Sequence, residues 1–185
     1  MTPYHLALFL HILGALGISI ALGLEWMSLI NLQRITTAEQ AREWLSVFPS
    51  LRRIGPLSII TLFLAGLYMT LTVWKWVPWI GLALLAMFLL PALGAANGQR
   101  MAAIEETLAT EKGPLSPAIL QQLHAPELWT SLRLRTAVLT GIIFLMTIKP
   151  GLVGALLAIG IALALAFIYD KLPRLQTHNE KVVQN

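Results

Sequence analysis

One imidazole and three thioethers are the side chains of this sequence that point most directly to chemistry. His11, Met69, Met87 and Met146 lie in four separate apolar stretches. Imidazole nitrogen and thioether sulfur are borderline or soft ligands, which suit copper or an axial position on haem iron. The competing interpretation is structural. Methionine commonly fills apolar cores, and a neutral histidine can hydrogen-bond to a neighbouring helix.

The composition indicates which solvent surrounds these side chains. The 185-residue chain is 57% hydrophobic and only 12% charged, whereas a soluble domain has about 25% charged residues. This excludes an ordinary soluble enzyme and a disordered chain. The chain has a net charge of +4, but it has no basic run longer than Arg52-Arg53. No nucleic-acid partner is therefore expected. The absence of cysteine removes disulfides and thiolate metal sites.

Five apolar segments are candidates to cross a bilayer, whose hydrocarbon core of ~30 Å needs about 20 helical residues. They run from about Tyr4 to Leu29, Leu57 to Trp74, Trp79 to Ala96, Leu132 to Ile148 and Leu152 to Tyr169. The sequence therefore predicts an all-α, polytopic membrane helical bundle. Residues 1–173 would form a single transmembrane domain, and residues 174–185 a polar cytoplasmic tail.

The positions of the basic residues predict the orientation of this bundle. Eleven of the 13 Lys and Arg residues fall on one side of the predicted spans, and only Lys75 and Lys149 fall on the other. Cytoplasmic loops are enriched in Lys and Arg. We therefore expect the N-terminus outside, five crossings and the C-terminus in the cytoplasm.

This topology places the four candidate ligands at similar depth. His11 lies roughly 10 Å below the outer end of its span, and the three methionine sulfurs lie within roughly 5–12 Å of the outer face. Similar depth is compatible with one binding site and also with a packed core. His5 is about 240° away from His11 around the same helix, so the two cannot bind one metal. If His11 bound a haem iron, the second axial ligand would be a methionine, a lysine or the His11 of a second subunit.

An arginine also falls within the membrane on this prediction. The 13 residues between Arg135 and Lys149 span about 20 Å of helix, less than the ~30 Å core. Arg133 is about 200° away from Arg135, so only one of them can face the interior. An inward guanidinium would pair with Glu25 or bind an anion such as a haem propionate.

Two connections on the predicted cytoplasmic side contain short interfacial helices. Thr37 and Gln40 have the spacing of a capping box, and a helix with one apolar face would follow and stop at Pro49. That face consists of Ala41, Trp44, Leu45 and Phe48. Arg52 and Arg53 would then be available to lipid phosphates. A second helix would begin at Ser116-Pro117 and end before Pro126. Each helix contacts either lipid or a protein partner.

Small residues line one face of the first span. Gly14, Gly17 and Ala21 recur at helical spacing, a pattern that lets another helix approach closely. The pattern would serve either packing within the chain or a homodimer.

Short motifs in a consistent order carry a resemblance to a known family. They are Leu10-His11-Ile12-Leu13-Gly14, Arg53-x-x-Pro56 leading to Leu64-Ala65-Gly66-Leu67-Tyr68, Trp76-x-x-Trp79, and Arg135 followed by Met146-x-x-Lys149-Pro150. Together they resemble the CopD-like group of small bacterial integral membrane proteins, and more distantly the HemJ-type protoporphyrinogen oxidases. The resemblance implies a multi-pass protein of the bacterial inner membrane, copper passage or haem b binding, and His11 as the axial ligand. The resemblance also implies Lys149 as a candidate for the functional lysine of the family. The HemJ-type lysine lies inside a span, however, whereas Lys149 lies at an outer helix end beside Pro150.

These observations lead to three functional hypotheses. The first is a haem b binding or electron-transfer module with His11 axial, Met69 or Met87 opposite, and Arg135 near a propionate. The second is a copper-binding or copper-passage protein that uses His11, Met69, Met87 and Met146. The third is a non-catalytic membrane scaffold that dimerises through Gly14, Gly17 and Ala21.

Overall fold

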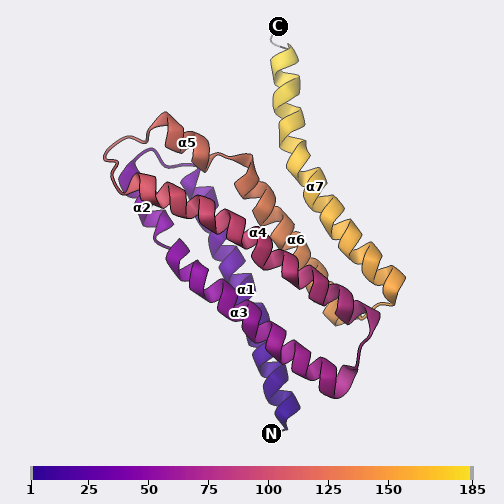
Figure 1. Cartoon of the computed structure of the whole chain (residues 1–185). Coiled ribbons are helices and arrows are strands. Elements are labelled where there is room, and N and C mark those ends of the chain that lie inside the picture. Colours follow the sequence, from indigo (N-terminus) through magenta and orange to yellow (C-terminus); the bar gives the residue numbers. More distant parts are fainter. Residues whose placement is uncertain (1, 184–185) are drawn as a thin grey trace. The chain divides into compact units, whose positions relative to one another are not determined.

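Helices account for almost all of the regular structure. The computed structural model describes the backbone of residues 2–183 and the side chains of residues 2–168. Figure 1 follows the helices along the chain, and their bounds are α1 (Pro3–Leu32), α2 (Ala38–Leu45), α3 (Phe48–Met69), η1 (Thr70–Trp74, a π-helical turn), α4 (Pro78–Leu108), α5 (Pro117–Leu123), α6 (Pro126–Ile148) and α7 (Leu152–Val183).

Four helical stretches are long and apolar enough to cross a membrane. They are Pro3–Leu32, Ala38–Trp74, Pro78–Leu108 and Pro117–Ile148. The protein is therefore a multi-pass helical membrane protein, as the composition predicts. The predicted fifth span corresponds to α7, whose described apolar part, Leu152–Ile168, is shorter than the other four. The side chains of the predicted tail at residues 174–185 lie outside the described residues.

The chain divides into two compact units. The first contains α1, α2, α3, η1, α5 and the part of α4 from Pro91 onward. The second contains the part of α4 up to Leu90, together with α6 and α7.

Close packing of α1 on α3 organises the first unit. A Cβ atom at Gly14 would lie 2.9 Å from the Leu62 Cβ atom and 2.9 Å from the Ser58 carbonyl oxygen, and one at Gly17 would collide with the Ser58 hydroxyl. Glycine at these positions lets the two backbones approach, because any side chain would push them apart. Gly14 and Gly17 on the small-residue face of α1 thus serve packing within the chain, and the use of this face in a homodimer stays a prediction.

The first unit also has a well-packed core where α2 and α5 lie. The apolar face of α2 is fully buried at Ala41 and Leu45, and that of α5 at Ile119 and Leu123. Met101 and Leu108 of α4 are buried to the same degree. The apolar faces of both short helices are thus covered by protein rather than by lipid.

The predicted boundary of α2 is wrong at its C-terminal end. The helix ends at Leu45, and Phe48 begins α3. Pro49 lies in the first turn of α3, where proline is tolerated because the first N–H groups of a helix have no intrahelical acceptor. Pro49 therefore helps to start the next helix and does not stop the preceding one.

The second unit pairs α6 with α7. A Cβ atom at Gly141 of α6 would lie 2.8 Å from the Ile159 Cδ1 atom of α7. Arg135 is buried on α6, and the Arg133 guanidinium carbon lies 5.7 Å from the centre of the Trp129 ring. The structure thus identifies Arg135 as the more buried of the two arginines.

Candidate functional site

His11 is held against α3 by a hydrogen bond to the backbone. Its Nδ1 atom lies 3.0 Å from the Leu62 carbonyl oxygen. A carbonyl oxygen can only accept a hydrogen bond, so Nδ1 carries the proton in the neutral ring. The Nε2 atom then has a lone pair. A ligating histidine commonly has this arrangement, with one nitrogen bonded to a carbonyl and the other directed at the metal.

The ring of His11 lies against Gly66, one turn beyond Leu62 on α3. A Cβ atom at Gly66 would lie 3.0 Å from the His11 Cε1 atom and 3.2 Å from its Nδ1 atom. The Gly66 carbonyl oxygen accepts a 2.8 Å hydrogen bond from the Thr70 hydroxyl, at the start of η1. The α3 backbone thus contacts the imidazole directly, with no side chain between them at position 66.

Met69 lies on the same face of α3. It is three residues after Gly66 and seven after Leu62, spacings that return to one side of an α-helix. Its side chain is buried. Of the four predicted ligands, the structure therefore brings His11 and Met69 to one stretch of the α1–α3 interface, within about one helical turn along the axis.

The remaining predicted site residues belong to the second unit. Met87 and Arg135 are buried, and Met146 is half-buried. Met87 lies on α4, and Arg135 and Met146 lie on α6. Within the described part of the chain, no three His, Asp or Glu side chains gather as a metal site, so the candidate site depends on imidazole and thioether donors.

A buried polar pair in the first unit is absent from the predicted site. The Asn97 amide of α4 donates a 3.1 Å hydrogen bond to the Glu25 carboxylate of α1, and both side chains are more than nine-tenths buried. Ser28 is fully buried one turn beyond Glu25. The sequence signal for this pair was the Asn97 amide directly after a predicted span. The predicted third span ended at Ala96, whereas α4 continues to Leu108.

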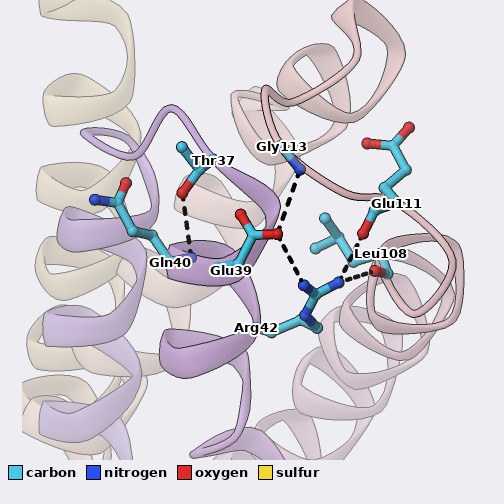
Figure 2. Close-up of polar contacts among 7 residues, drawn as sticks. All are labelled: Thr37, Glu39, Gln40, Arg42, Leu108, Glu111 and Gly113. Carbon is cyan, nitrogen blue, oxygen red and sulfur yellow. Dashed lines mark hydrogen bonds and ion pairs between the residues drawn. The ribbon is translucent and has the colours of Figure 1, made fainter.

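Arg42 joins the two polar connections of the first unit, as Figure 2 shows. Its guanidinium donates 2.8 Å hydrogen bonds to the carbonyl oxygens of Leu108 and Glu111, and it pairs with Glu39 at 3.3 Å. The Glu39 carboxylate also accepts a 3.3 Å hydrogen bond from the Gly113 N–H. We call these five residues the Arg42 clamp.

Backbone and capping bonds complete the junction around the Arg42 clamp. The Ala38 N–H donates to the Gly113 carbonyl oxygen at 2.8 Å. Thr37 accepts from the Gln40 N–H at 3.4 Å, which confirms the predicted N-terminal cap. Arg52, expected to face lipid phosphates, forms a 3.0 Å ion pair with Glu105.

Comparisons with known proteins do not extend these observations. No protein-family model, no curated protein and no solved structure matches the chain.

Proposed function

We propose that the protein is a membrane-embedded haem b binding or electron-transfer module in which the Nε2 atom of His11 is an axial ligand. The observation that carries this proposal is the hydrogen bond from His11 Nδ1–H to the Leu62 carbonyl oxygen. That bond fixes the ring and leaves the ligating nitrogen with its lone pair. A haem would supply one-electron redox chemistry at this position.

The residues around His11 fit such a group. A hydrogen bond from Nδ1–H to a carbonyl raises the basicity of the imidazole as a ligand and fixes its orientation. The apolar surface of α1 and α3 would keep water away, which tunes the potential of a bound haem. Met69 supplies a thioether on the same face of α3. Met87 as the alternative axial ligand and Arg135 as the propionate partner remain predictions from the sequence alone.

The test is an absorption spectrum of the purified protein after expression with an adequate haem supply. We expect a Soret band in the wild type and its loss in His11→Ala. His5→Ala is the matched control, because His5 lies on the same helix but is exposed and interacts with Thr2. A wild type without a Soret band, or an equal band in His11→Ala, would overturn the proposal.

Copper binding is the second candidate function, and the position of Met69 favours it. An imidazole and a thioether at one stretch of the α1–α3 interface are ligands that suit Cu(I). Metal analysis of the same preparation should then show copper, and Met69→Leu should weaken its binding. Met27→Leu is the control, since Met27 is an exposed methionine of α1. Equal copper binding in Met69→Leu and Met27→Leu would exclude this site.

A further inference from the structure

We infer that the backbone of α3 selects the His11 tautomer, and that Gly66 is the positioning residue that lets it do so. The inference deepens the proposed function, because it identifies what sets the ligating nitrogen of the same site. The contacts of His11 with Leu62 and Gly66 carry the inference, and they belong to the protein without any cofactor.

The Leu62 carbonyl oxygen favours one tautomer of the His11 ring over the other. Leu62 lies inside α3, so its carbonyl oxygen already accepts the helical hydrogen bond from residue 66, and its second lone pair remains for a side chain. His11 Nδ1 lies 3.0 Å from that oxygen. With the proton on Nε2 instead, two lone pairs would face each other and the carbonyl would lose this donor. The Nδ1–H form therefore dominates, and Nε2 is the atom available to a ligand.

Gly66 permits this contact because it has no side chain. A methyl group there would lie 3.0 Å from His11 Cε1 and 3.2 Å from Nδ1, closer than carbon atoms normally approach. The imidazole is anchored between α1 and α3, so its ring would have to tilt or withdraw, and the hydrogen bond to Leu62 would lengthen. Alanine otherwise favours a helix over glycine, so the change acts on the ring and not on helix formation.

Gly55 provides the matched control within the same helix. A Cβ atom at Gly55 would meet no atom within 4 Å. Gly55→Ala therefore makes the same chemical change in α3 without touching His11.

The experiment is nitrogen NMR of the apoprotein in bilayers, with ¹⁵N-labelled histidine. The chain has four histidines, and the His11 resonances are assigned by their loss in His11→Gln. At a pH where the ring is neutral, we expect a protonated Nδ1 and an unprotonated Nε2 in the wild type and in Gly55→Ala. In Gly66→Ala we expect a mixture of tautomers. A wild-type His11 with the proton on Nε2 overturns the inference without any variant.

Haem titration of the same three proteins gives a second readout. We expect Gly66→Ala to bind haem about 10- to 100-fold more weakly, the range typical for loss of a group that orients a metal ligand, and Gly55→Ala to bind as the wild type does. If Gly66 only allowed helix packing, Gly66→Ala would lower stability and leave the His11 tautomer unchanged, which also overturns the inference. The predicted tautomer with no haem bound to any variant would refute the proposed function alone.

Discussion

Single glycines of α1 differ sharply in what surrounds them, and this predicts opposite effects of the same substitution. Gly14→Ala would place a methyl group 2.9 Å from the Leu62 Cβ and N atoms. Overpacking of this kind costs about 1–3 kcal/mol. Gly23→Ala is the control, because nothing lies within 4 Å of that position, and alanine there should be neutral or stabilising by up to about 1 kcal/mol. Unfolding in mixed detergent micelles measures both. Equal stability of the two variants would contradict the packing of α1 on α3.

At the same scale, the sequence predicts donor atoms better than the groups that hold them. His11 and Met69 could be singled out because imidazole nitrogen and thioether sulfur are ligands that suit copper or haem iron, and both side chains lie in predicted spans. The Leu62 carbonyl could not, since every residue carries one and only the fold shows which of them meets a ring. Asn97 was visible as an amide beside a predicted span, but pairing it with Glu25 required the packing of α4 against α1.

Among the elements, the short helices show where sequence periodicity stops being informative. The apolar face of α2 predicts that this face is buried, but the sequence pattern is the same whether lipid or protein covers it. The structure covers Ala41 and Leu45 with protein. The Thr37 cap was predictable because capping is local in sequence. The bonds from Arg42 to Leu108 and Glu111 were not, since they join segments more than 60 residues apart.

The Arg42 clamp predicts a pH dependence of the α2 junction. Hydrogen bonds from the Glu39 and Gly113 N–H groups lower the pKa of the Glu39 carboxyl below its ordinary value of 4.5. A lowered pKa means that the carboxylate stabilises the fold above the ordinary value, and that this contribution is lost as the pH falls through the lowered pKa. We expect hydrogen-exchange protection of the Gly113 amide, corrected for intrinsic exchange, to decrease in that acidic range.

Variants of α2 distinguish the Arg42 clamp from general acid unfolding. Glu39→Gln should remove the pH dependence at Gly113 and lower its protection at neutral pH. Glu43→Gln is the control, since Glu43 lies exposed on the same helix and is not part of the clamp. If Glu39→Gln and Glu43→Gln behave alike, the carboxylate of Glu39 does not hold this junction.

For the whole molecule, the number of crossings decides on which side the C-terminus lies. Four helical stretches are long enough to span, and the apolar part of α7, Leu152–Ile168, has 17 residues or about 25 Å of helix. This is the lower end of the range for a transmembrane helix, about 17–25 residues. The basic residues Lys171, Arg174 and Lys181 follow it, and a cytoplasmic position for them requires that α7 cross the membrane.

Because the chain has no cysteine, a single introduced thiol reports the side directly. With an outside N-terminus, five crossings place Thr177 in the cytoplasm and four place it outside. We therefore expect a membrane-impermeant maleimide added to intact cells to label Trp76→Cys, in the predicted outer connection, but not Thr177→Cys until the membrane is permeabilised. Gln121→Cys, on exposed α5 surface, should behave like Thr177→Cys. Labelling of Trp76→Cys and Thr177→Cys together in intact cells would mean that α7 does not cross the membrane. Labelling of Gln121→Cys alone would mean that the first four helices have the opposite orientation.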